Sequence, residues 1–343
     1  MEPDPAATLR RIAYLLERDL AESYKVRAFR KAAATLDATD AAELRRLAEI
    51  NHLTDLEGVG ETSGRIIAQS LAGEVPPYLT ELEGKTTLPA LDEAGTAIRQ
   101  SLLGDCHSHS DWSDGGSPIE EMARAARALG HSYVALTDHS PRLTVAHGLN
   151  AERLLAQLQV VAELNEKMAP FRILTGIEVD ILEDGALDQD AELLSLLDVV
   201  VASVHSKLRM ESRQMTNRMI RAIESPHTDI LGHCTGRLIV GKGRPESTFD
   251  AEAVFDACAR TGTAVEINSR PERRDPPHEL LVQALDQGCV VTIDTDSHAP
   301  GQFEWLPFGC EKAAAAGLAS ATERIMNTKS ADELLLWTDS HAA

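Results

Sequence analysis

The sequence predicts an α/β protein in which a small all-helical domain precedes a parallel barrel of seven β/α units. Three observations predict this fold. Residues 6–73 carry apolar side chains at helical spacing. After Leu102, short runs rich in β-branched residues alternate with stretches of good helix formers. Each of these runs leads into a histidine or a carboxylate, and parallel barrels carry their chemistry at the C-terminal ends of the strands.

The helical domain is predicted over residues 1–75. Leu9 and Leu16 belong to an apolar stripe with helical periodicity. Asp40 followed by Glu43 is typical of the cap that begins a helix, here over residues 41–50. Further on, two closely spaced glycines allow a tight turn before another helix.

A linker is predicted over residues 76–101. This stretch contains three prolines and a mixture of charges, and we expect it to include one short helix.

The barrel is predicted over residues 102–343. Its strands are expected at Leu102–His107, Tyr133–Thr137, Arg172–Val179, Val199–Val204, Ile230–His233, Ala264–Asn268 and Val290–Asp294. The intervening stretches, such as Pro118–Gly130 and Ala151–Ala169, have helix-forming composition.

Composition excludes several classes of protein. The chain has 343 residues, which is about two domains' worth, and its 43% hydrophobic and 25% charged residues are ordinary for globular proteins. It has no run of about 18 apolar residues, so we expect no membrane span. Its N-terminus lacks the apolar core of a signal peptide, so we expect a cytoplasmic protein. Five widely spaced cysteines without a CxxC motif indicate reduced thiols.

The charge balance argues against non-specific binding of nucleic acid. The 33 basic and 54 acidic residues give a formal net charge of −21. Such a chain repels nucleic acid unless it carries a local basic patch or bound cations. Aromatic residues make up only 4%, which leaves little material for a base-stacking platform.

Potential metal ligands lie at the end of every predicted strand. His107 and His109 stand two residues apart, so their imidazoles face the same side of a strand. The others are Asp114, Asp138, His139, Glu178, His205, His233, Glu266, Asn268, Asp294, Asp296 and His298. A single histidine at a strand end is usually structural, but the repetition along one barrel indicates a metal site. Mixed imidazole and carboxylate ligands suit zinc, manganese or iron, and their number implies more than one ion.

These segments resemble the PHP (polymerase and histidinol phosphatase) superfamily, and most closely the PHP domain of bacterial family X DNA polymerases. The matching segments are HSHSDWSDG, ALTDHS, GIEVDIL, VASVHS, ILGHCTGRL, AVEINSRPER and TIDTDSHAP. The resemblance implies a distorted (β/α)7 barrel and three divalent metal ions. It implies that the first ion binds His107, His109, Glu178 and Asp296, the second Glu178, His205 and His233, and the third Asp114, His139 and His298.

The helical domain also resembles family X polymerases. YKVRAFRKAA, from Tyr24, matches their amino-terminal domain, and LEGVG, from Leu56, matches its helix-hairpin-helix. The polymerase core is missing, and Ile66 stands near the position of the lysine that serves some relatives as a lyase nucleophile. We therefore expect neither polymerase nor lyase activity. Ser63 and Gly64 replace the usual apolar residues of the hairpin, which is thus either loosened or repurposed.

Three functions remain open. The first is a phosphoesterase that hydrolyses DNA, oligonucleotides or nucleotides through a metal-activated hydroxide, including 3′–5′ exonuclease action. The second is a phosphatase of a small phosphorylated metabolite such as histidinol phosphate. The third is a non-enzymatic DNA-binding adaptor. The oligomeric state has no signature in the sequence.

Candidate residues follow for each role. Glu178, Asp296 and His298 are the candidate catalytic residues by the resemblance. Candidate substrate-binding residues are Lys207, Arg237, Asn268 and Arg270, with a surface lysine and a loop-fixing arginine as the alternatives for the first two. Candidate nucleic-acid contacts are Lys25, Arg27, Arg30, Gly58 and Gly60, with a solvated helix face as the alternative for the basic run.

Overall fold

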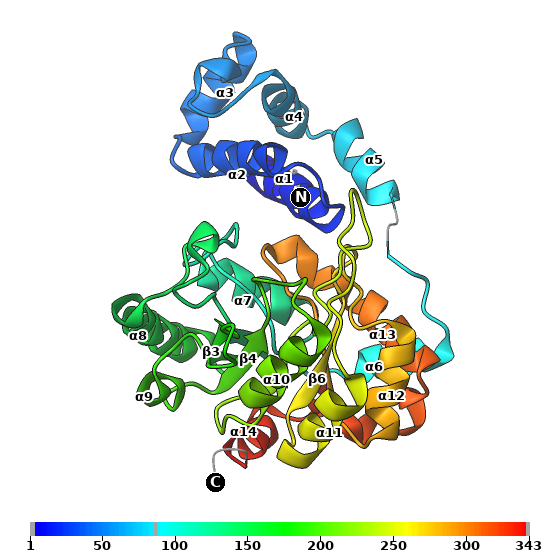
Figure 1. Cartoon of the computed structure of the whole chain (residues 1–343). Coiled ribbons are helices and arrows are strands. Elements are labelled where there is room, and N and C mark those ends of the chain that lie inside the picture. Colours follow the sequence, from blue (N-terminus) through cyan, green and yellow to red (C-terminus); the bar gives the residue numbers. More distant parts are fainter. Residues whose placement is uncertain (1–3, 86–87, 341–343) are drawn as a thin grey trace. The chain divides into compact units, whose positions relative to one another are not determined.

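The computed structural model describes residues 4–85 and 88–340, which form two compact units (Figure 1). The helical unit holds residues 4–85 and 300–302, and the α/β unit holds residues 88–299 and 303–340. None of the helices in these described ranges is long and apolar enough to cross a membrane.

The helical unit confirms the predicted all-helical domain. Its elements are α1 (Pro5–Arg18), α2 (Ser23–Asp37), α3 (Ala41–Glu49), the 3₁₀ turn η1 (Leu53–Asp55), α4 (Glu61–Leu71) and α5 (Pro77–Gly84). The side chains of Leu9, Ile12 and Ile66 are fully buried in a shared core. The Asp40 carboxylate accepts hydrogen bonds from the backbone at Ala42 and the following residue, which is why α3 begins at the expected position.

The helix-hairpin-helix turn joins η1 to α4. Gly58 has a φ of 75°, a left-handed conformation that a residue with a Cβ adopts only with strain. The Ser63 hydroxyl accepts a hydrogen bond of 2.9 Å from the Gly60 backbone N–H. This contact caps the start of α4, so the serine strengthens the turn rather than loosening it.

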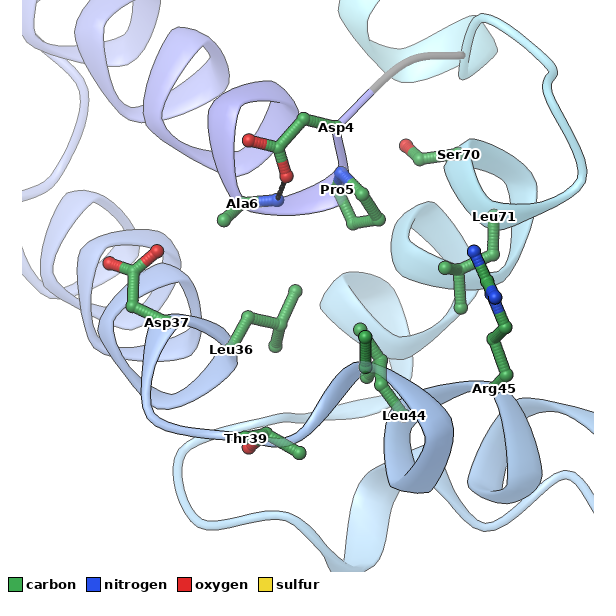
Figure 2. Close-up of a pocket in the computed structure, with 11 residues that line it drawn as sticks. Asp4, Pro5, Ala6, Leu36, Asp37, Thr39, Leu44, Arg45, Ser70 and Leu71 are labelled. Atoms are coloured by element: carbon green, nitrogen blue, oxygen red, sulfur yellow. Dashed lines mark hydrogen bonds between the residues drawn. The ribbon is translucent and has the colours of Figure 1, made fainter.

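The helical unit has a pocket at one end, of about 310 Å³, between the start of α1, the end of α2, α3 and α4. Figure 2 shows the side chains that line it. Leu36, Leu44 and Leu71 line it together with Ser70, whose buried hydroxyl has no hydrogen-bond partner. A buried hydroxyl without a partner costs stability.

Residues 76–101 hold two helices instead of the one expected. Helix α5 packs its Leu82 side chain into the core of the helical unit. Helix α6 (Glu93–Ser101) packs against α13 and buries Ile98 in the α/β unit. The division between the two units therefore falls between these helices.

The α/β unit confirms the predicted barrel of seven parallel strands. They run in sequential order as β1 (Gly104–Asp105), β2 (Tyr133–Leu136), β3 (Arg172–Asp180), β4 (Val199–Ser203), β5 (Ile230–Leu231), β6 (Ala264–Asn268) and β7 (Val291–Asp294). A single parallel bridge between Ser108 and Ser297 connects the ends that follow β1 and β7, so the barrel is nearly closed. Strands β2 and β4 are buried along their whole length, as expected for a sheet covered on both faces.

Helices surround the barrel (Figure 1). They are α6, α7 (Ile119–Ala128), α8 (Ala151–Met168), α9 (Ala191–Leu194), α10 (Ser212–Ile223), α11 (Ala251–Thr261), α12 (His278–Asp286), α13 (Leu306–Ala315) and α14 (Ala331–Asp339). The 3₁₀ turns are η2 (Thr144–Ala146), η3 (Pro300–Trp305), η4 (Leu318–Ser320), η5 (Thr322–Arg324) and η6 (Met326–Thr328).

Strand β3 changes partner at Gly176. Residues 172–175 pair with β2, whereas Gly176 and the residues after it pair with β4. A Cβ at this glycine would lie 2.7 Å from the Val199 carbonyl oxygen and 3.0 Å from that of Leu136. The close approach of three backbones therefore requires glycine here.

We predict that Gly176→Ala lowers the free energy of unfolding by about 1–3 kcal/mol, because the added methyl group forces neighbouring strands apart. Urea denaturation would measure it. Gly116→Ala is the matched control, since its Cβ would meet nothing closer than the His298 carbonyl oxygen at 3.6 Å. Equal stability of the two variants would contradict the steric explanation.

Candidate metal centre

The C-terminal ends of the strands bring all nine predicted ligands into one region. Seven of them line a single cavity of about 450 Å³, namely Asp114, His139, Glu178, His205, His233, Asp296 and His298. His107 and His109 lie beneath it, with Nε2 atoms 3.5 and 3.6 Å from Glu178 Oε2. The barrel thus gathers side chains that are separated by up to 191 positions.

Glu178 lies between two sets of imidazoles. Its Oε1 atom is 2.9 Å from His233 Nε2 and 3.1 Å from His205 Nε2. Its Oε2 atom faces His107 and His109 on the other side. One carboxylate can therefore serve two neighbouring ions, which is the arrangement that the family resemblance implies.

Asp296 completes the group around His107 and His109. Its Oδ1 atom is 3.4 Å from His109 Nε2 and 3.9 Å from His107 Nε2. The donor atoms of His107, His109 and Glu178 all lie within 4.8 Å of one another. This spacing fits the first of the three expected ions.

A second group lies nearer to solvent. His139 Nε2 and His298 Nε2 are 3.5 and 3.3 Å from Asp114 Oδ1. These three residues and His109 offer donor atoms within 4.8 Å of one another. A third such group joins His139 and Glu178 to His205. These three groups overlap the three ligand sets that the resemblance implies, but their members are not the same in every case.

The hydrogen bonding of the centre fits bound cations. His107 Nε2, His109 Nε2 and His233 Nδ1 are buried without a hydrogen-bond partner. Leaving such atoms unpaired is costly, and a divalent ion would satisfy those that face the centre. Nitrogen and oxygen donors of this kind suit divalent metals.

The electrostatics keep Glu178 and His109 in the forms that bind metal, whereas the carboxylates around His107 and His205 raise the pKa of both imidazoles, to about 9 for His205. Burial opposes ionisation of Glu178, but the nearby imidazoles, His205 foremost, hold the pKa of this carboxyl well below its ordinary value. Burial and the neighbouring His298 lower the pKa of His109 to about 3, so its imidazole is neutral. Ionised carboxylates and neutral imidazoles are the ligating forms.

Glu266 supports two of the ligands from below. Its Oε1 atom lies 2.6 Å from His107 Nδ1, and its Oε2 atom accepts a 2.5 Å hydrogen bond from the His233 backbone N–H. The first contact fixes the imidazole so that Nε2 points to Glu178. Sequence reasoning placed Glu266 at a strand end without giving it a role, although its position two residues before Asn268 indicates that both face the same side.

Polar side chains from the end of β6 and from the segment after it hold Asp296. Asn268 Nδ2 donates to Asp296 Oδ2 at 3.2 Å, and Arg270 Nη1 donates to the Asp296 carbonyl oxygen at 3.0 Å. Arg273 Nε is 3.3 Å from Asp296 Oδ2. Both arginines line the cavity, so Arg273 joins the candidates that the sequence singled out.

Of the four predicted substrate contacts, Arg270 lines the cavity, whereas Lys207, Arg237 and Asn268 do not. Lys207 is exposed, does not line the cavity, and has its Nζ 3.9 Å from Glu183 Oε1. Arg237 donates through Nε to the Arg273 carbonyl oxygen at 3.0 Å and through Nη2 to that of Arg274. It fixes the loop that carries Arg273, which was the alternative left open for it.

Three of the five predicted nucleic-acid contacts lie together in the helical unit. Lys25, Gly58 and Gly60 line a cavity of about 630 Å³. Arg27 is exposed outside this cavity. Arg30 Nε is 2.6 Å from Glu17 Oε1, so this arginine is engaged in an ion pair inside its own unit.

Comparison with known proteins identifies the family. The PHP domain family matches residues 105–270, and the helix-hairpin-helix domain family matches residues 2–75. A probable phosphatase of Thermoanaerobacter sp. (strain X514) is 32% identical over 217 residues, which cover 59% of this chain and 83% of that protein. The chain belongs to the PHP-domain family.

Two further comparisons cover different shares of this chain and of the matched protein. The "DNA polymerase/3'-5' exonuclease PolX" of Bacillus subtilis (strain 168) is 38% identical over 256 residues, which are 75% of this chain. The matched part is 44% of that protein, so this PHP protein spans under half of its length. The solved histidinol phosphate phosphatase of Lactococcus lactis aligns with a TM-score of 0.46 and 18% identity, over 63% of this chain and 94% of its own.

Family and site together define the class of reaction. This PHP protein is a hydrolase of phosphoric ester bonds, and its clustered histidine and carboxylate ligands are a centre for divalent metal ions.

We predict that Glu266→Gln weakens metal binding by about 10–100-fold, because the amide no longer holds His107 as a charged acceptor does. Calorimetric titration of the metal-free protein with manganese would measure the loss. Glu163→Gln, at an exposed position of α8, is the control and should bind as the unaltered chain does. Unchanged affinity in Glu266→Gln would contradict the supporting role.

Proposed function

We propose that this PHP protein hydrolyses phosphodiester bonds in DNA or oligonucleotides from a 3′ end, with its helical unit binding the substrate. The observation that carries the proposal is the placement of Arg270 and Arg273 in the same cavity as the ligand groups around Glu178. A phosphoester bound there meets the arginines with its anionic oxygens. Guanidinium groups suit this task because they bind such oxygens in pairs.

The ligand set suits three divalent ions, with zinc, manganese or iron as the candidates. When bound, such ions screen the phosphate charge and lower the pKa of water that they coordinate. The chain's own residues orient the substrate. Arg270 is held by the Asp296 carbonyl oxygen and lies 3.0 Å from His298 Nδ1, so its guanidinium has a fixed position at the cavity wall. Fixed charges of this kind stabilise a developing negative charge without having to reorient.

The helical unit supports a nucleic-acid substrate over other phosphoesters. The cavity beside its hairpin brings together Lys25, Arg65 and the two hairpin glycines. Exposed backbone at a glycine such as Gly58 binds a phosphate without reading the base, whereas the Gly60 N–H already donates to the Ser63 hydroxyl. The relative from Bacillus subtilis, whose name describes a 3′–5′ exonuclease, matches 75% of this chain and supports the same substrate.

A small phosphorylated metabolite is the second candidate. The net charge of −21 disfavours a long polyanion, and the Thermoanaerobacter relative is named a probable phosphatase. The adaptor hypothesis does not hold, since the family is one of hydrolases.

We predict that the manganese-loaded protein shortens single-stranded DNA stepwise from the 3′ end. The panel would include double-stranded DNA, mononucleotides, histidinol phosphate and a generic aryl phosphate, with products separated by electrophoresis or measured as released phosphate. Release of phosphate from monoesters alone would replace this proposal with the metabolite phosphatase.

The control for the panel is the double variant His107→Ala/His109→Ala. It removes two buried ligands, so hydrolysis of every substrate should fall to background. The helical unit should keep its structure, which circular dichroism would follow. Hydrolysis retained in the metal-free double variant would overturn the assignment of the centre.

We also predict that Lys25→Ala weakens DNA binding and lowers the slope of log affinity against log salt by about 1, because one phosphate contact is lost. Fluorescence anisotropy at several salt concentrations would measure this slope. Lys85→Ala is the control, since this lysine ion-pairs with Glu81 at 2.8 Å and lies outside the hairpin cavity. Equal slopes for the two variants would remove Lys25 from the interface.

A further inference from the structure

A rigid loop stands at the mouth of the metal cavity. Residues 238–244, here named the rim loop, are closed by backbone hydrogen bonds of 2.9 and 2.8 Å between Leu238 and Arg244. Gly241 and Gly243 have φ values of 69° and 65°, which let the chain turn tightly at the tip. The rim loop is therefore a small hairpin with a defined shape.

The rim loop is tied to the segment that carries the cavity arginines. The Ile239 backbone N–H donates to the Glu272 carbonyl oxygen at 2.7 Å. Glu272 lies between Arg270 and Arg273, which both line the cavity. The position of the loop tip is thus fixed relative to the groups that meet the phosphate.

Two large apolar side chains are exposed on this tip. Ile239 and Val240 are 52% and 55% exposed. Single exposed apolar residues are common, but two adjacent ones on a fixed tip beside a cavity form a surface that gains from being covered. Val240 lines the cavity, together with Leu238 and with Leu143 from the loop after β2.

The cavity is therefore lined by two chemically different kinds of group. The ligands, the two arginines and Glu272 supply its charged and polar groups, and Leu143, Leu238 and Val240 supply its aliphatic groups. Its volume of about 450 Å³ is of the size that holds a small molecule or a single unit of a polymer. The matching ligand carries an anionic phosphoryl group next to an uncharged, apolar face.

We infer that Val240, which lines the cavity with the exposed Ile239 next to it, is a specificity-determining residue that contacts the nucleobase of the nucleotide at the scissile phosphate. The inference rests on the proposed function, because it names the part of a nucleic-acid substrate that the aliphatic groups receive. A polyhydroxylated sugar phosphate would gain nothing from aliphatic side chains. A nucleobase has two flat faces of low polarity, and inserted aliphatic side chains separate such bases from their neighbours in other proteins.

The contact carries no information about base identity. The side chains of Ile239 and Val240 have neither donors nor acceptors, and every base presents a similar face. The rim loop should therefore distinguish a nucleotide with a base from one without, while accepting all four bases to a similar extent.

The experiment compares two single-stranded oligonucleotides that differ only in the 3′-terminal nucleotide, one with a base and one abasic. The manganese-loaded protein should hydrolyse the terminus that carries the base roughly tenfold more efficiently in kcat/KM, the discrimination that a small apolar contact supplies. In Ile239→Thr/Val240→Thr this preference should fall to within about twofold. Both side chains are half exposed, so the variant should melt as the unaltered chain does.

A second readout follows binding directly. A terminal 2-aminopurine joined by a phosphorothioate, which slows hydrolysis, changes its emission when the base leaves the stack. This change should occur with the unaltered chain and be absent with the double variant. Leu196→Thr is the matched control, because this side chain is 55% exposed and lies outside the metal cavity.

The outcomes separate the two proposals. Equal rates on the two termini, or a preference that survives in the double variant, would overturn the role of the rim loop and leave nuclease activity standing. An unaltered chain that hydrolyses neither oligonucleotide but releases phosphate from small monoesters would overturn the proposed function, and the inference with it.

Discussion

The metal centre depends on the burial of one carboxylate. Glu178 is 1% exposed, and burying an ionised carboxyl is expensive unless opposite charge or hydrogen-bond donors surround it. Here imidazoles from four other strand ends face its two oxygens. Its backbone is fixed on both sides, by pairing with Val201 in β4 and by a bridge to His139. The parallel barrel is thus the means by which distant histidines reach a single buried acid.

Side chains that hydrogen-bond to the metal ligands fix the shape of the metal centre. Strand β6 ends with Glu266 and Asn268, which hold His107 and Asp296 respectively. The segment after it continues with Arg270, which donates to the Asp296 backbone. Supporting contacts of this kind set which ring nitrogen faces the metal and keep the cations of the wall in place before a substrate arrives.

Much of the fold and of the metal centre could be predicted from the sequence, because both follow from two repeating patterns. Residues two apart on a strand share a face, and β/α alternation places strand ends together, so the ligand region followed from His107, His109 and their counterparts. The path of a loop, by contrast, depends on backbone turns and on contacts between distant residues, and a local sequence pattern does not predict it. Lys207 has a φ of 54°, which turns the chain immediately after His205, and Arg237 is drawn to carbonyl groups 36 and 37 residues away. The prolines before α5 indicated a linker, although a proline at the first helical position begins a helix as readily as it interrupts one.

The acidity of the chain bears on its reaction as well as on its surface. Charges farther apart than the screening distance of about 8–10 Å contribute little at physiological salt, so most of the net charge of −21 acts weakly on a bound phosphate. The carboxylates of Asp114, Glu178 and Asp296 are different, because they line the cavity itself. Without cations they repel a phosphoester. With cations the same residues bring positive charge to the place where the arginines already lie. Substrate binding and metal binding in the barrel are therefore coupled by the ligand set, and this cavity accepts an anionic substrate only where that coupling operates.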